Sequence, residues 1–262
     1  MRRIRAVLLD IDGTLTVAWR PVPGAVEAVA RLRDAGLAVA LVTNTTSRTR
    51  AQMAAALAEE GFRVGPQDVF TAPAITAGYL ASKYPGARCV LLNSGEVTED
   101  LPGVTIVSPD DAGQPDVLIL GGAGPEFSYQ ALNRAFGYLL GGARLVAMTA
   151  AMYWRTDTGL QLDAGAFLPG LEQAAGVQAE VTGKPAAAFF AAALTAVGAA
   201  ASEAVMVGDD IEADVLAGQR HGLSGVLVRT GKYRPDSGHR VSGTPDHIVD
   251  SVADLPALLG CG

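Results

Sequence analysis

The chain has 262 residues, of which 49% are hydrophobic and 18% are charged, so it is too apolar to be disordered. Lys and Arg number 20 against 27 Asp and Glu, and the net charge of −7 argues against binding to a nucleic-acid backbone. Cys89 and Cys261 have no CxxC spacing, so neither a disulfide framework nor a zinc site is expected. At about 150 residues per domain, one large or two modest domains are predicted.

Two apolar segments bear on the location of the protein. The first apolar run, residues 6–9, ends at Asp10 and is too short for an export signal. The longest uncharged run, residues 185–202, approaches the length of a membrane span, but it opens on Pro185 and contains Gly198. It predicts a buried helix rather than a membrane span. A cytoplasmic protein without membrane partners is therefore expected.

Short apolar runs alternate with helical patterns at both ends of the chain. Strands are predicted over residues 5–10, 38–42, 204–208, 224–229 and 246–249. Helices are predicted over residues 24–35, 48–60 and 211–220. Because these strands are apolar throughout rather than alternating, they predict a parallel sheet covered on both faces, and hence an α/β fold.

The middle of the chain is too long to be a loop and has strands of its own, predicted over residues 89–92, 117–120 and 145–148. We predict an inserted domain over residues 74–177, with residues 1–73 and 178–262 forming the other domain. Within the insert, Tyr153 and Trp154 either belong to its core or contact a substrate.

Polar residues follow four of the predicted apolar segments. Asp10-Ile11-Asp12-Gly13-Thr14 places two carboxylates just past the first strand, and Gly13 allows the chain to turn there. The other three clusters are Thr43-Asn44, Lys184 and Gly208-Asp209-Asp210 with Asp214.

Each cluster also has an ordinary structural explanation, such as a solvated turn, a helix cap or a surface charge. In an open α/β sheet, however, ligands bind beyond the carboxyl ends of the strands, and one site accounts for all four clusters. The acids of the first and last clusters would hold a hard divalent cation, for which Mg²⁺ is suited. The Thr, Asn and Lys side chains would face a phosphate, which favours phosphoryl transfer.

These four elements, in this order, resemble those of the haloacid dehalogenase-like hydrolase superfamily. The insert follows Asn44 and precedes Lys184, which is similar to the type 2 cap of subfamily IIA. Residues 152–184 resemble the phospholysine phosphohistidine inorganic pyrophosphate phosphatase group. The resemblance implies a Rossmann-like, doubly wound parallel-sheet core with a smaller inserted α/β cap domain.

The resemblance also implies roles for individual residues. Asp10 would be the nucleophile that forms an aspartyl-phosphate, and Asp12 the general acid and base. The implied metal residues are Asp10, Asp12 (through its main-chain carbonyl) and Asp209. The implied phosphate-binding residues are Thr43, Asn44 and Lys184. Asp214, and with it Asp210, would orient waters and Lys184.

The leading hypothesis is a Mg²⁺-dependent phosphatase acting on a small phosphorylated metabolite, as a phosphate ester or phosphoamide. Because Asp12 is present, the resemblance favours a phosphatase over a dehalogenase. A phosphotransferase or mutase of the same superfamily is the nearest alternative. A non-catalytic, phospho-accepting signalling or binding protein is an alternative of another class. Neither a nucleic-acid nor a membrane partner is expected, and a homodimer is left open.

Overall fold

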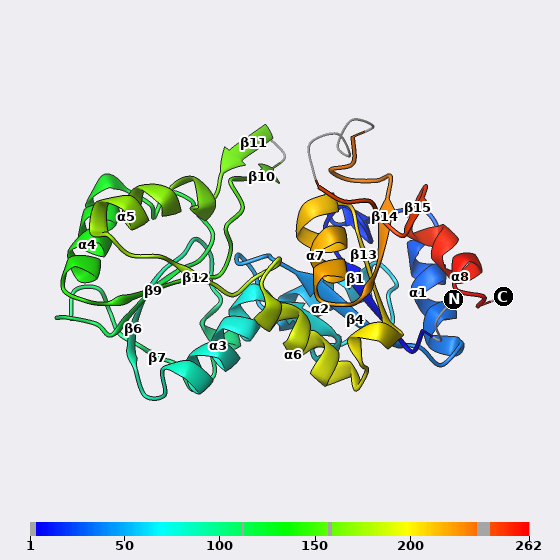
Figure 1. The fold of residues 1–262 in the computed structure, drawn as a ribbon, viewed down its shortest axis with the longest axis horizontal. Coiled ribbons are helices and arrows are strands. Elements are labelled where there is room, and N and C mark those ends of the chain that lie inside the picture. Colours follow the sequence, from blue (N-terminus) through cyan, green and yellow to red (C-terminus); the bar gives the residue numbers. More distant parts are fainter. Residues whose placement is uncertain (1–3, 112, 157–158, 235–241, 262) are drawn as a thin grey trace. The chain divides into compact units, whose positions relative to one another are not determined.

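The computed structural model describes residues 4–111, 113–156, 159–234 and 242–261, and its ribbon is drawn in Figure 1. The chain forms two compact units, each discontinuous in sequence. Unit 1 comprises Met1–Thr43, Arg50–Phe70 and Lys184–Gly262, and unit 2 comprises Asn44–Thr49 and Thr71–Gly183. Both are built on parallel sheets with helices, so the predicted α/β class is confirmed.

Unit 1 is organised around a sheet of six strands in the order β15-β14-β13-β1-β4-β5. The strands are β1 (Ala6–Asp10), β4 (Ala38–Thr43), β5 (Val69–Thr71), β13 (Ala204–Gly208), β14 (Ser224–Val228) and β15 (His247–Val249). The registered pairs from β15 through β4 are parallel. Every residue of β1 and β13 is buried, which explains why these strands are apolar without alternation.

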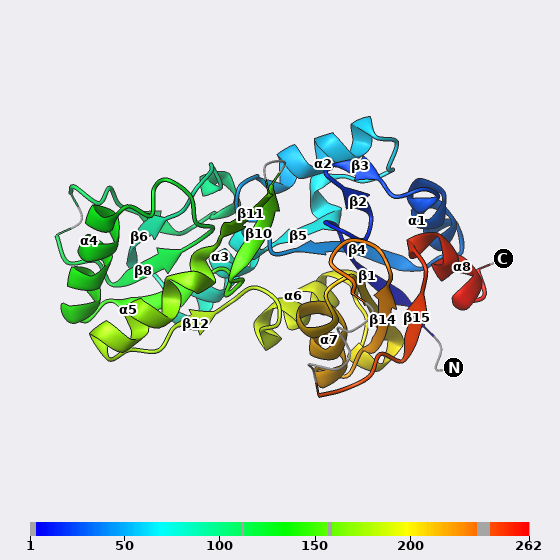
Figure 2. The ribbon, with the colours of Figure 1, turned by 90° about the horizontal axis from the view of Figure 1, so that it is seen from above.

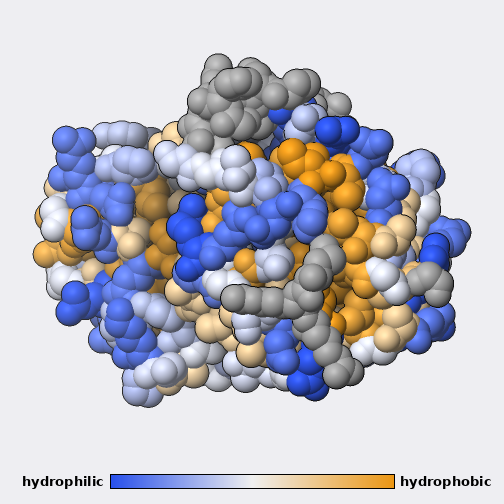
Figure 3. Space-filling model, turned by 45° about the vertical axis from the view of Figure 1, so that its right-hand side comes forward, coloured by the Kyte–Doolittle hydropathy of each residue, from blue (hydrophilic) through white to orange (hydrophobic). Residues whose placement is uncertain are grey.

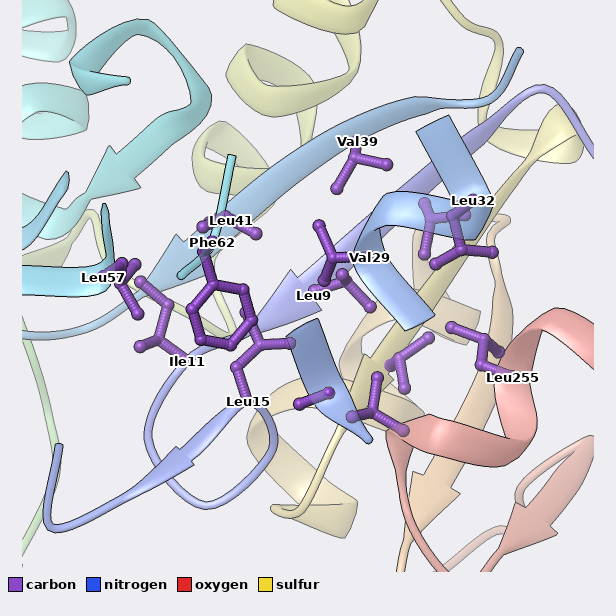
Figure 4. Packing of buried hydrophobic residues seen from close by; sticks show 14 of the residues in the cluster. Leu9, Ile11, Leu15, Val29, Leu32, Val39, Leu41, Leu57, Phe62 and Leu255 are labelled. Carbon is purple, nitrogen blue, oxygen red and sulfur yellow. The ribbon is translucent and has the colours of Figure 1, made fainter. Parts of the chain in front are cut away.

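Helices cover both faces of this sheet, as Figure 2 shows, with α1 and α2 on one side and α6 and α7 on the other. These helices are α1 (Ala25–Asp34), α2 (Arg50–Glu59), α6 (Ala187–Val197) and α7 (Ala217–Arg220), and α8 (Leu255–Leu258) lies near the C-terminus. Leu9 and Leu41 of the sheet join one buried cluster with Val29, Leu32 and Leu57 of the helices (Figure 4). Successive strand residues point to opposite faces, and since every residue of β1 and β13 is buried, both faces of these strands are covered.

Two predicted helices of unit 1 differ in the structure. The uncharged run 185–202 was expected to be one buried helix, but α6 spans only Ala187–Val197 and buries only Phe189, Phe190 and Ala193. It ends because Gly198 adopts the left-handed conformation, φ +62°, which terminates helices. The predicted helix 211–220 begins as a π-helical turn, Ile211–Leu216, before α7. No helix formed by the described residues is both long and apolar enough to cross a membrane.

Unit 2 has a second parallel sheet in the order β12-β9-β8-β6-β7. Its strands are β6 (Arg88–Leu92), β7 (Thr105–Ile106), β8 (Val117–Leu120), β9 (Arg144–Ala147) and β12 (Glu180–Val181). Its helices are α3 (Ala72–Lys83), α4 (Tyr129–Leu140) and α5 (Leu168–Ala175). Leu118 of β8 packs with α4 and α5, whereas its neighbour Ile119 packs with α3. The unit therefore has its own two-sided core.

Two hairpins complete the fold. In unit 2, β10 (Tyr153–Thr156) pairs with β11 (Gly159–Leu162). Tyr153 is 56% exposed and Trp154 is 41% exposed, so neither belongs to the core of the insert.

Figure 3 shows one face of the molecule, where hydrophobic residues lie exposed among hydrophilic ones.

In unit 1, β2 (Thr16–Val17) pairs with β3 (Arg20–Pro21), and the two turn residues, Ala18 and Trp19, have φ +50° and +63°. This left-handed backbone is unfavourable for both side chains. Short 3₁₀ turns occur at Pro66–Asp68, Thr98–Asp100, Ala164–Ala166, Ala201–Glu203 and Val252–Asp254.

Candidate active site

The register of the central strands aligns three of the predicted site residues. Asp10 ends β1 and lies opposite Val42 of β4, so Thr43 follows at the same edge. Leu9 lies opposite Val207 of β13, so the residues after Gly208 emerge beside Asp10. Asp10, Thr43 and Asp209 are all buried. The sheet therefore gathers these side chains at its carboxyl edge.

Lys184 reaches this edge from the segment that re-enters unit 1. Its Nζ lies 2.6 Å from Oδ1 of Asp10 and 2.7 Å from Oδ1 of Asp214, and its side chain is only 3% exposed. Nζ also donates to the carbonyl oxygen of Val42 at 3.5 Å. Burial opposes the charged form, but the two carboxylates raise the pKa of Lys184, so it remains an ammonium group.

The turn after β1 brings the backbone close to Asp209. Gly13 has φ +94°, and a Cβ at this position would lie 1.9 Å from Oδ2 of Asp209. Only glycine fits both the conformation and the space. The side chain of Asp12, one residue earlier, is exposed, whereas that of Thr14 is buried and its Oγ1 donates to Oδ2 of Asp10 at 3.4 Å.

The π-helical turn after β13 positions Asp214. Oδ1 of Asp210 accepts from the amides of Glu212 and Ala213 and so caps the turn. Asp214 then folds back over the end of β13, where a Cβ on Gly208 would lie 2.2 Å from Oδ2 of Asp214. Gly208 thus leaves the space that the Asp214 carboxylate needs where it pairs with Lys184. π-Helical turns often occur at functional sites.

Asp10, Asp209 and Asp214 form a buried group whose ligand atoms all lie within 4.8 Å of one another. Burial, followed by the charges of Asp10 and Asp214, raises the pKa of Asp209 to about 8. Burial likewise raises the pKa of Asp214 to about 7, although Lys184 opposes this shift. Clustered carboxylate oxygens that are short of positive charge fit a hard divalent cation.

Lys232 also contacts this site, although the sequence analysis did not identify it. Its main-chain N–H donates to Oδ2 of Asp209 at 2.6 Å, and its Nζ lies 3.2 Å from Oδ2 of Asp210. A signal was present, because Thr230-Gly231-Lys232 follows β14 as the other polar clusters follow their strands.

The site residues predicted from the sequence fall into both units, and most of them belong to unit 1. Asp10, Thr43, Lys184 and Asp209 meet at one edge of the unit 1 sheet, and Asp12 stands in the adjoining turn. Asn44 belongs to unit 2, where a Cβ on Gly183 would lie 2.8 Å from its Oδ1.

The chain is also similar in sequence to known proteins. A family model described as haloacid dehalogenase-like hydrolase matches residues 7–106, and a HAD-hydrolase-like model matches residues 181–255. The human phospholysine phosphohistidine inorganic pyrophosphate phosphatase is 38% identical over 262 residues, covering 98% of this chain and 94% of the relative.

Solved structures are similar over nearly the whole chain. NagD from E. coli K-12 has a TM-score of 0.85 at 30% identity, covering 96% of this chain and 98% of that one. The p-nitrophenyl phosphatase from Archaeoglobus fulgidus has a TM-score of 0.89 at 26% identity, covering 98% and 99%.

Proposed function

This chain belongs to the haloacid dehalogenase-like hydrolase family and is a phosphatase of that family, and we propose that it is Mg²⁺-dependent and works through an aspartyl-phosphate on Asp10. The observation that carries this proposal is the buried Lys184, whose ammonium bridges Asp10 and Asp214. A carboxylate at the end of a central strand, beside a fixed cation, is suited to attack an anionic phosphate group.

In the first step, a carboxylate oxygen of Asp10 attacks phosphorus, and the bond between phosphorus and the leaving group breaks. Asp12 donates a proton to the leaving oxygen or nitrogen. In the second step, Asp12 takes a proton from water, which attacks the aspartyl-phosphate, so that phosphate is released and Asp10 is regenerated. The exposed side chain of Asp12 supports this role, because a group that exchanges protons with water must be accessible.

Mg²⁺ would be held by the carboxylates of Asp10 and Asp209 and the main-chain carbonyl of Asp12. When bound, it would neutralise charge on the transferring phosphoryl group. Lys184 would contribute a second positive charge, and Thr43 and Asn44 would donate hydrogen bonds to phosphate oxygens. Asp214 would keep Lys184 in place through its 2.7 Å ion pair.

We propose a small phosphorylated metabolite as the substrate, as a phosphate ester or phosphoamide. The name of the human relative refers to phosphorylated lysine and histidine and to pyrophosphate, which supports both bond types. We further propose that residues 74–177, predicted from the sequence as the inserted cap, select the substrate. The chain enters the insert through Thr71 and leaves unit 2 at Gly183, immediately before Lys184, so one end of the insert is tethered at a proposed phosphate-binding residue.

Release of inorganic phosphate from an aryl phosphate tests the proposal. We expect turnover with Mg²⁺, none after exhaustive chelation, and recovery when Mg²⁺ is restored. Full activity after chelation would overturn the metal assignment. Phosphoryl transfer to an added alcohol or sugar phosphate, without release of inorganic phosphate, would favour the phosphotransferase alternative instead.

A further inference from the structure

The loop Thr230-Gly231-Lys232, which follows β14 after Arg229, contacts two of the proposed metal-binding segments. Main-chain N–H of Lys232 donates to Oδ2 of Asp209 at 2.6 Å. The hydroxyl of Thr230 donates to the main-chain carbonyl of Gly13, in the turn that follows Asp10. A single short loop therefore joins the Asp10–Thr14 turn to Asp209.

We propose that this loop positions the carboxylate of Asp209 for the cation, with the main chain of Lys232 holding Oδ2 and leaving the second oxygen for the metal. This inference rests on the proposed Mg²⁺-dependent function. A hydrogen bond from an amide to a carboxylate is charge-assisted and therefore among the stronger kinds. Removal of a group that orients a metal ligand typically weakens metal affinity or activity about 10- to 100-fold.

Steric fit supports the proposal independently of the hydrogen bond. A Cβ on Gly231, which has φ +58°, would lie 2.0 Å from Oδ2 of Asp209 and 2.5 Å from Cα of Gly13. A Cβ on Gly13 would meet the same carboxylate oxygen at 1.9 Å. The carboxylate thus lies between two glycines, and any side chain at either position would displace it.

The charge of Lys232 is separable from this main-chain contact. Its side chain is 61% exposed, and Nζ lies 3.2 Å from Oδ2 of Asp210 rather than on Asp209. Lys232→Met removes the ammonium but keeps the N–H that holds Asp209. If the main chain is what positions Asp209, this variant should not weaken cation binding, because it also removes a positive charge that repels the cation.

The experiment measures Mg²⁺ dissociation constants by titration calorimetry on metal-free full-length protein, which requires no turnover. We expect Gly231→Ala to weaken Mg²⁺ binding about tenfold or more, as loss of a ligand-orienting group does. Thr230→Val should weaken Mg²⁺ binding by a smaller factor. Thr230→Ser keeps the hydroxyl and should bind Mg²⁺ with wild-type affinity, and Lys232→Met should not weaken Mg²⁺ binding. In activity assays, excess Mg²⁺ should restore most of the kcat of Thr230→Val.

Circular dichroism and thermal unfolding establish that each variant is folded, and if Gly231→Ala does not fold, the Thr230→Val and Thr230→Ser pair decides. Wild-type affinity in folded Gly231→Ala or in Thr230→Val would overturn the positioning role. Weakening by Lys232→Met to the level of Thr230→Val or beyond would overturn the main-chain assignment. Failure of the wild-type protein itself to bind Mg²⁺ would instead refute the proposed function.

Discussion

The ammonium of Lys184 lies 2.6 Å from Oδ1 of Asp10, and both groups are buried although 174 positions separate them in the chain. Asp214 holds the same ammonium from the other side at 2.7 Å. Such an arrangement contributes little net stability, because desolvation of the charges offsets their attraction. We interpret the arrangement as functional, since it fixes a cation beside the proposed nucleophile.

Lys184→Met should therefore be damaging for both stability and activity. It leaves Asp10 and Asp214 buried without their shared cation, and breaking a buried pair costs about 3 kcal/mol of unfolding free energy. Urea unfolding of metal-free protein measures this loss. The double variant Lys184→Met, Asp214→Asn removes one of the orphaned charges and should recover part of the stability but not the activity. Wild-type stability in the single variant would contradict the interpretation.

Asp10→Asn should abolish phosphate release while the protein remains folded. The substitution removes the nucleophile, and it also removes one of several mutually repelling buried charges, so the metal-free protein should be no less stable than wild type. Phosphate release and thermal unfolding measure the two effects. Turnover near the wild-type rate would refute the nucleophile assignment.

Asp12→Asn should behave differently from Asp10→Asn. Loss of a general acid matters less when the leaving group is good, so the defect should be smaller for an activated aryl phosphate than for an alkyl phosphate. The ratio of kcat/KM between the two substrates reports this directly. Equal defects for both substrates would argue against the general-acid role.

The pH dependence of stability should reveal the acidic cluster in the metal-free protein. The pKa of Asp209 is raised by burial from 3.8 to about 8. Between these values the folded state binds a proton that the unfolded state has released, so stability falls as pH rises, by up to about 1.4 kcal/mol per pH unit for one group. Thermal unfolding in chelator from pH 5 to 8 should show the midpoint falling.

Saturating Mg²⁺ should flatten this decline, because the cation binds the ionised carboxylates and stabilises the folded state. Asp209→Asn is the matched control: it should show a shallower decline in chelator and a smaller response to Mg²⁺. A midpoint that rises with pH in the metal-free protein would be inconsistent with the buried cluster.

The β2–β3 turn should be open to stabilisation. Ala18 is exposed and has φ +50°, a conformation that costs alanine about 1–2 kcal/mol and glycine almost nothing. After the entropic cost of glycine in the unfolded chain, Ala18→Gly should raise the unfolding free energy by about 0.5–1 kcal/mol. Ala51→Gly, at an exposed position of α2, is the control and should lower it by about 1 kcal/mol. Urea unfolding distinguishes the opposite signs.

The insert should carry the substrate preference. Replacing residues 74–176 with the corresponding segment of a relative that prefers another substrate should shift kcat/KM ratios toward the donor's preference. The requirements for Mg²⁺ and for Asp10 should be unchanged, because both belong to unit 1. A folded chimaera with unaltered preference would place selectivity in residues 15–22 instead.

The fold class and much of the site follow from the pattern of apolar and polar residues along the chain. Apolar runs such as β1 and β13 must be buried on both faces, so they specify a parallel sheet. The polar residues that end such strands meet at one edge because parallel strands all finish on the same side. Asp10, Thr43 and Asp209 could therefore be placed together without coordinates, and the family resemblance is confirmed.

The pairing of the buried charges, in contrast, follows from the three-dimensional path of the turns. The contact of Lys184 with Asp214 depends on the π-helical turn that brings Asp214 back over Gly208, and residue spacing predicted an ordinary helix there. The main-chain bond from Lys232 to Asp209 depends on the path of a loop that has no periodic signal. Hydrophobic periodicity records which residues avoid water, whereas distances between buried charges depend on turns whose energies differ too little to be read from the sequence.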